Sequence, residues 1–236
     1  MEIEVLRRTK QVTDVWSGGT TTQLAIWPPE ADYKSGDFKW RISTARVEQE
    51  ESVFTSLPGF HRCLMLLKGS IRLIHENHGE VILSPFGQSG FDGSWRTVSK
   101  GKCIDFNLML AAGYEGRIAP FQSGRVVNLF MPLTEGHGFR RITEMFYCLC
   151  PIELILFREN SVKRSLHLKN GDFVSFRSQN ASASDEGRIS VNAVLKGISD
   201  ARICAIQSTI QENETIRDKV FLGARPVVKL LRRIVM

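Results

Sequence analysis

The sequence predicts an all-β protein built from two β units. Three observations carry this prediction. Short runs rich in β-branched and aromatic residues recur along the chain, turn residues separate these runs, and no convincing amphipathic helix occurs before residue 210. A length of 236 residues allows one large domain or two small ones, either with a hydrophobic core. This pattern alone does not distinguish a barrel from a sandwich or a jelly roll.

The first half of the chain carries strand-like runs at residues 39–47, 61–67, 70–76, 80–83 and 102–109. Gly69 separates the second run from the third, and Asn77-His78-Gly79 is typical of a hairpin turn. The last run alternates apolar and polar residues. We expect Ile104, Phe106 and Leu108 on one face and Asp105, Asn107 and Met109 on the other.

The second half repeats this organisation, with candidate strands at residues 125–131, 152–158, 162–168, 172–177, 188–195 and 202–209. Residues 169–172 are typical of a turn, and the small polar residues at 179–187 suit an exposed hairpin loop. The stretch 113–124, which contains glycines and Pro120, is the weakest strand candidate and the best boundary. We therefore expect β units at 1–118 and 119–218, followed by a distinct tail at 219–236.

The positive charge of the chain is concentrated in this tail. The formal net charge is +6, and the tail has five basic residues and no acid, which leaves 6 − 5 = +1 for residues 1–218. The overall charge therefore gives no reason to expect a nucleic-acid partner. Residues 227–236 could form a short helix that binds a membrane surface. The favoured interpretation is a terminal helix docked on the barrel or on a dimer partner, so a homodimer stays open.

Five scattered cysteines suit a reducing compartment better than a disulfide framework. Cys148 and Cys150 lie in an apolar run and are interpreted as small buried residues rather than half of a metal site. No basic segment followed by an apolar stretch opens the chain, and no apolar run approaches the ~20 residues that a membrane-spanning helix needs. We expect a cytoplasmic protein without a membrane span.

The histidines do not form a convincing metal site. His75 and His78 are three residues apart, and His78 falls in the expected turn, so a polar hairpin tip is favoured over a pair of ligands on one strand face. His61, His137 and His167 lie far apart in the sequence. Gly18-Gly19 precedes a strand rather than a helix, which favours a tight turn over a phosphate cradle. We expect no metal, no cofactor and no catalytic residue.

Polar residues on otherwise apolar strands are more informative. Arg41 and Ser43 share one strand face, as do Asp105 and Asn107, and Arg62 begins a strand. A charge on a buried strand must be paired or must face water or a ligand. One interpretation is an internal Arg–Asp pair that fixes the barrel. The other is a polar pocket in a barrel mouth, where an arginine fork matches a carboxylate. The two interpretations are compatible.

Four blocks of sequence carry a family resemblance: WSGGTTTQL at 16–24, FKWRISTARV at 38–47, SVFTSLPGFHR at 52–62 and DFNLM at 105–109. In this order, over about 95 residues, they resemble the motifs of the HutD/Ves family of bacterial cupin-type proteins. The C-terminal half carries no sharp motif. The chain departs from the family pattern at Gln23, where an acid is common, and this departure leaves the ligand identity open.

The resemblance implies a bicupin, with two cupin-like (RmlC-type jelly-roll) β-barrels in one chain, the second of them degenerate. It also implies a non-catalytic protein that regulates histidine utilisation by binding a small carboxylate such as urocanate or formylglutamate. Arg41 and Arg62 would take the carboxylate. The ligand-binding residues implied by the resemblance are Trp16, Thr21, Gln23, Arg41, Ser43, Arg62, Asp105 and Asn107. The alternative is a cupin enzyme, of the isomerase or dioxygenase type, that acts on a small organic acid.

Overall fold

The computed structural model describes residues 1–131, 133, 139–158, 161–178, 189–194 and 202–213. The predicted all-β class is confirmed, since the described residues form strands and one short 3-10 turn, η1 (Arg8–Lys10). None of the described helices is long and apolar enough to cross a membrane. The expected loop at 179–187, the tail at 219–236 and His137 lie outside the described residues.

The first barrel is made of a six-stranded and a four-stranded sheet. The six-stranded sheet runs in the order β2 (Val12–Trp16), β3 (Gly19–Trp27), β4 (Trp40–Val47), β11 (Cys103–Ala111), β6 (Phe60–Gly69) and β9 (Gln88–Asp92). The four-stranded sheet runs in the order β5 (Glu51–Val53), β10 (Thr97–Lys100), β7 (Ile71–His75) and β8 (Gly79–Leu83). All pairings are antiparallel, and one apolar cluster that includes Leu64, Leu73 and Phe91 fills part of the space between the sheets.

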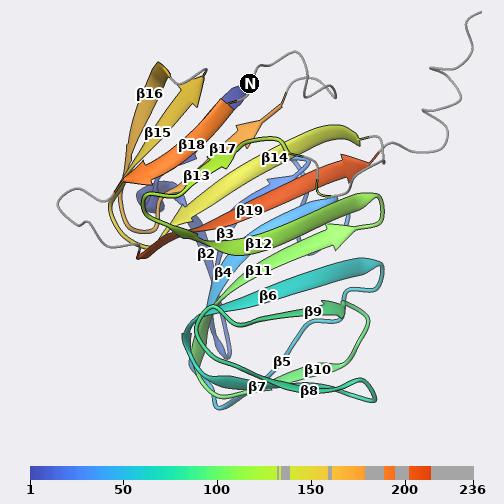
Figure 1. Cartoon of the computed structure of the whole chain (residues 1–236). Helices are drawn as coiled ribbons and strands as arrows, with labels where there is room; N and C mark the ends of the chain where they lie inside the picture. Colours follow the sequence, from blue (N-terminus) through green and yellow to red (C-terminus); the bar gives the residue numbers. More distant parts are fainter. Residues whose placement is uncertain (132, 134–138, 159–160, 179–188, 195–201, 214–236) are drawn as a thin grey trace, which may run out of the picture.

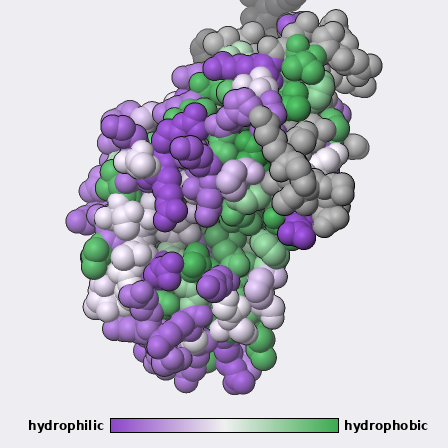
Figure 2. Space-filling model, turned by 90° about the vertical axis from the view of Figure 1, so that its left-hand side faces the viewer, coloured by the Kyte–Doolittle hydropathy of each residue, from purple (hydrophilic) through white to green (hydrophobic). Residues whose placement is uncertain are grey.

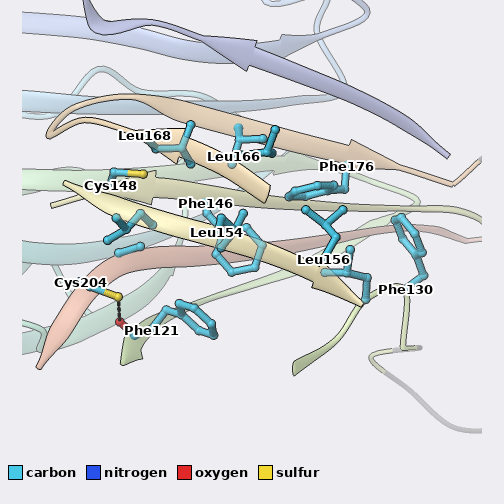
Figure 3. Packing of buried hydrophobic residues seen from close by; sticks show 14 of the residues in the cluster. Phe121, Phe130, Phe146, Cys148, Leu154, Leu156, Leu166, Leu168, Phe176 and Cys204 are labelled. Carbon is cyan, nitrogen blue, oxygen red and sulfur yellow. Dashed lines mark hydrogen bonds between the residues drawn. The ribbon is translucent and has the colours of Figure 1, made fainter. Parts of the chain in front are cut away.

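The second barrel repeats this plan with a five-stranded and a four-stranded sheet. The five-stranded sheet runs in the order β1 (Glu2–Leu6), β17 (Phe173–Arg177), β14 (Phe139–Cys148), β19 (Ile203–Asn213) and β12 (Tyr114–Gln122). The four-stranded sheet runs in the order β13 (Val126–Asn128), β18 (Ile189–Val194), β15 (Ile152–Arg158) and β16 (Ser161–Leu168). Its interior contains a large cluster of buried hydrophobic residues. Figure 3 shows Phe121, Phe146, Leu154 and Phe176 packed together there, with the thiol of Cys204 on the carbonyl of Phe121.

The two barrels share a third core between their larger sheets. In Figure 1 strands of the two larger sheets lie in the middle of the molecule, with one smaller sheet above them and the other below. Phe106 and Leu108 of β11 pack in one cluster with Met145 of β14 and Ile206 of β19, and all four side chains are buried. Burial of this interface stabilises both halves of the chain, because apolar area removed from water contributes about 25 cal/mol per Å².

One sequence expectation is wrong in detail. The stretch 113–124, expected to be the weakest strand candidate, forms the nine-residue strand β12. β12 lies at the edge of its sheet and pairs only with β19, so Pro120 has no second neighbouring strand to bond. Gly116 allows a close approach, because a side chain there would crowd Leu108 and Leu110 of the first barrel.

Two strands pair across the predicted division at residues 118 and 119. β12 begins before the division and pairs with β19, and β1, at the start of the chain, pairs with β17. The five-stranded sheet of the second barrel therefore contains β1 and the start of β12, which belong to the predicted first unit. The division into 1–118 and 119–218 stays a prediction, since strand pairing alone does not delimit folding units.

Hydrogen bonds to Asp172 hold the N-terminal segment against the second barrel. Its carboxylate accepts hydrogen bonds from the backbone N–H groups of Lys169 and Arg8 and from Nη1 of Arg7, at 2.9, 3.0 and 2.7 Å. Burial by itself would raise the pKa of Asp172, but these hydrogen bonds outweigh it and hold the pKa below its ordinary value. The turn expected at 169–172 thus also positions β1.

Asp172→Asn is expected to lower the free energy of unfolding at pH 7 by about 1.5–3 kcal/mol, the range for hydrogen bonds to a charged group. Because the folded pKa is depressed, this stabilisation is present above the unfolded pKa of about 3.9 and is lost as the pH falls through the folded pKa. Urea denaturation at several pH values measures it. Glu76→Gln, which breaks the exposed pair with Arg96, is the control and should cost under about 1 kcal/mol. Equal losses for both variants at pH 7 would contradict the role of Asp172.

Candidate functional site

The candidate site is a cavity of about 390 Å³ in the first barrel. Its lining includes seven of the eight residues expected at a ligand site: Trp16, Thr21, Arg41, Ser43, Arg62, Asp105 and Asn107. The eighth, Gln23, is not among the lining residues, but its Oε1 accepts a hydrogen bond from Nε of Arg41 at 2.9 Å. The structure therefore brings all eight together, seven at the cavity wall and one behind it.

Strand alternation places these side chains on the cavity wall. On β11, Phe106 and Leu108 face the core between the barrels, so Asp105, Asn107 and Met109 face the cavity, as the sequence predicts. Met109 lies opposite Arg41 of β4 on one side and Arg62 of β6 on the other. The next cavity-facing pair along β11 is Asn107 with Ser43. The two arginines are thus set in one row across three strands.

Arg41 is buried, with 3% of its surface exposed. Its Nη1 donates to Oγ of Ser43 at 3.2 Å, and its guanidinium lies 4.2 Å from the centre of the Tyr33 ring. Burial lowers the pKa of Arg41, while Tyr33 and Asp14 oppose that shift. No carboxylate in the described part of the chain forms an ion pair with this guanidinium.

Arg62 is equally buried and has fewer polar partners. Its Nη1 donates to the backbone carbonyl of Thr55 at 3.3 Å, while its Nε, also buried, has no hydrogen-bond partner. The guanidinium lies over the rings of Phe54 and Phe91, at 4.8 and 5.3 Å. Burial lowers the pKa of Arg62 to about 10, and repulsion from Arg41 acts in the same direction. A buried cation with an unused donor is costly unless something else binds it.

Asp105 is the buried acid of the cavity, with 4% of its surface exposed. Burial raises the pKa of Asp105 to about 7, although Arg62 and the backbone N–H of Ala45 both favour the ionised form. Its Oδ1 has no hydrogen-bond partner, and neither has Oδ1 of Asn107. The Arg–Asp ion pair that one interpretation of the sequence expects is not formed among the described residues.

The Trp-Ser-Gly-Gly segment at residues 16–19 shapes one side of the cavity. Nε1 of Trp16 donates to Oγ1 of Thr21 at 3.2 Å, which fixes the indole across the turn between β2 and β3. A side chain at Gly18 would collide with the indole, and one at Gly19 would collide with the backbone of Arg46. The tight turn expected at these glycines is confirmed, and its role is to let Trp16 fold back against the cavity.

Sequence reasoning missed the aromatic residues that cover the arginines. Tyr33 lies in the connection between β3 and β4, where no strand pattern singles it out. Phe54 lies with Arg62 in the block SVFTSLPGFHR at 52–62, so its presence in that block was the sequence feature that could have identified it. Phe91 comes from β9, which pairs with β6 in the register Arg62–Phe91. Lys34 and Asp14 also line the cavity.

The residues of this cavity do not fit a metal site. Its lining contains two carboxylates, Asp14 and Asp105, and no histidine or cysteine. In the described part of the chain, no group of three histidine, cysteine, aspartate or glutamate side chains is arranged to hold an ion. His78 lies in the hairpin turn as expected and stacks on Trp95 at 3.9 Å. His75 is buried and shares a 2.9 Å hydrogen bond with Thr97, so it is more than a polar hairpin tip.

Comparison with known proteins identifies a family-model match and several solved structures with a similar fold. The HutD family model matches residues 8–124, which include all eight expected site residues. No curated protein matches the chain in sequence.

Two solved structures cover most of the chain with some sequence similarity. A conserved protein of unknown function from Pseudomonas aeruginosa PAO1 has a TM-score of 0.64 at 19% identity, covering 89% of this chain and 98% of that chain. HutD from Pseudomonas fluorescens SBW25, in a formate condition, has a TM-score of 0.61 at 20% identity, covering 91% of this chain and all of that chain.

A more distant structure shows the same fold alone. Oxalate decarboxylase from Lactobacillus farciminis, in complex with formate, has a TM-score of 0.54 at 6% identity, covering 93% of this chain and 90% of that chain. The bicupin architecture expected from the sequence is thereby confirmed.

Asp105→Asn is expected to change the pH dependence of stability. The folded pKa is about 7 and the unfolded pKa about 3.9, so Asp105 lowers the stability of the wild type progressively as the pH rises from about 4 to about 7. The variant should therefore be more stable than the wild type at pH 8, by about 1–4 kcal/mol, and equal to it near pH 4. Chemical denaturation across this range measures the difference. Parallel curves for the two proteins would contradict the prediction.

Proposed function

We propose that this chain, which belongs to the HutD family, binds a small carboxylate metabolite in the cavity of the first barrel and does not convert it. Family membership implies a link to histidine utilisation. We infer a regulatory role in that process, with urocanate or formylglutamate as the type of ligand. Trp16, Thr21 and Gln23 complete the site around the charged residues.

The observation that carries the proposal is the pair of buried arginines at one cavity wall. Arg41 and Arg62 bring two positive charges to a site where Asp105 supplies at most one buried negative charge, and Nε of Arg62 is unused. A planar guanidinium matches a carboxylate with two parallel hydrogen bonds, and such bonds are strong when they are shielded from water. A ligand carboxylate would supply the acceptors that the protein itself does not.

The apolar groups of the cavity favour a small organic acid over an inorganic ion. The rings of Tyr33 and Phe54 cover the arginines, and Val15 and Val53, which are 83% and 61% exposed, also line the cavity. A carboxylate can meet the guanidinium groups while an attached carbon chain contacts these apolar surfaces.

An enzyme of the cupin type, acting on a small organic acid, is the alternative. Such an enzyme would need a side chain that acts as an acid, a base or a nucleophile toward the ligand. The described lining offers Asp105 as a proton carrier but no imidazole or thiol. Nothing in this set of residues favours conversion over binding, so the binding function is the one we propose.

We place this function in the cytoplasm, because the free cysteines of the chain suit a reducing compartment. The proposed partner is the metabolite itself.

Thermal unfolding with urocanate, formylglutamate, histidine or formate tests the proposal. At one hundred times its dissociation constant a ligand adds about 2.7 kcal/mol of stability. For a chain of this size we expect the midpoint of unfolding to rise by roughly 5–10 °C with at least one carboxylate. Absence of a shift for every carboxylate would refute the proposed function.

Arg62→Met is expected to weaken carboxylate binding by about thirtyfold or more, since truncating one side of a buried charged hydrogen bond costs at least 2 kcal/mol. Arg46→Met is the matched control, because Arg46 lies on β4 with Arg41 but is exposed outside the cavity. Isothermal titration gives both affinities. Equal losses in the two variants would show that general charge, not the cavity, binds the anion.

A further inference from the structure

We propose that Asp105 takes up a proton when the anionic ligand enters the cavity and then acts as a hydrogen-bond donor to it. This inference rests on the proposed function. It assigns to Asp105 a role opposite to that of a permanent counter-ion: the residue binds the anion as a neutral acid. Carboxylate binding to this chain is therefore coupled to the uptake of one proton.

The position of Asp105 supports this role. Its side chain faces the same cavity as both arginines and is almost completely buried. Its Oδ1 has no partner, although a buried carboxylate normally accepts several hydrogen bonds. An oxygen with no donor aimed at it is poorly solvated as an anion. The same oxygen, once protonated, can give a hydrogen bond to an acceptor that arrives in the cavity.

The groups that face Asp105 set the direction of the effect. Arg62 and the backbone N–H of Ala45 favour its ionised form, and burial opposes them more strongly. Arg41, Lys34, Asp14 and Tyr33 are the other charged or titratable groups at the cavity.

Cys103 adds no negative charge near neutral pH. It lies two residues before Asp105 on β11, and burial, reinforced by Asp105, raises the pKa of its thiol to about 12. The described lining contains no histidine, and burial raises the pKa of Asp105 to about 7.

A bound carboxylate adds a negative charge to this cavity. A like charge nearby raises the pKa of a carboxyl group, so the pKa of Asp105 is higher in the complex than the value of about 7 in the free protein. Between these two pKa values the complex holds one proton more than the free protein. Affinity then falls as the pH rises through this interval, by up to tenfold per pH unit, and is constant below it.

Isothermal titration with formate and with formylglutamate tests the coupling, because these probes have no group that titrates between pH 5.5 and 8.5. Enthalpies measured in buffers of different ionisation enthalpy give the number of protons taken up. We expect about one proton at pH 8 and about none at pH 5.5. The dissociation constant should be flat below about pH 6 and should rise by about fivefold between pH 7 and pH 8.

Asp105→Asn should bind without proton uptake and with a dissociation constant that does not change with pH. Glu144→Gln is the matched control. Glu144 is a buried acid of the second barrel, with a pKa that burial raises to about 7, and it does not line the cavity. This variant should keep the full proton uptake of the wild type.

The outcomes separate the two proposals. Binding by the wild type without proton uptake and with a flat pH profile overturns the role of Asp105 and leaves the binding function standing. Proton uptake that persists in Asp105→Asn also overturns it. Failure of every carboxylate to bind at any pH refutes the binding function itself. The measurements on the wild type decide the matter even if Asp105→Asn does not fold.

Discussion

β11 is buried on both faces, and the two faces have opposite character. Phe106 and Leu108 pack into the core between the barrels, while Asp105, Asn107 and Met109 line the cavity. A shift of one residue in the pairing of β11 would bury Asp105 and Asn107 between the barrels and turn the ring of Phe106 into the cavity. The pairing of β11 with β4 and β6 therefore fixes the interface and the candidate site together. The same register places Arg41 and Arg62 on opposite sides of Met109, in one row across the three strands.

Several buried polar atoms of the candidate site are not satisfied by the rest of the protein. Two arginines and one aspartate are withdrawn from water, and hydrogen-bonding atoms of Arg62, Asp105 and Asn107 are left without partners. Buried polar groups are normally satisfied, so such a cluster marks a place where structure alone does not explain the residues. Aromatic rings lie over both guanidinium groups, and Nε of Arg62 has no polar partner, whereas Arg41 also donates to Gln23 and Ser43.

The second barrel shows what a satisfied version of this arrangement looks like. Glu144 also lies on a barrel strand and is buried, but its carboxylate accepts hydrogen bonds from Gln207 and Thr209, at 3.1 and 2.9 Å. The same barrel contains the cluster of buried hydrophobic side chains that Figure 3 shows. On the face of the molecule shown in Figure 2, hydrophobic side chains gather in a strip beside hydrophilic ones. The two barrels thus share a plan, while the unsatisfied polar atoms of Arg62, Asp105 and Asn107 lie at the cavity of the first.

The sequence by itself determined the all-β class, most strand positions in the first half and the face on which Arg41, Ser43, Asp105 and Asn107 lie. Those features follow from local alternation, which has a period of two residues and needs no knowledge of distant contacts. It could not show that the stretch 113–124 is a strand, because Gly116 and Pro120 are acceptable only at a sheet edge beside a close neighbour. It also could not show that β1 joins the second barrel. Only the tertiary structure decided that Tyr33 and Phe91 cover the arginines and that Asp105 forms no ion pair with them, since these facts depend on segments brought together across the barrel rather than on the chain nearby.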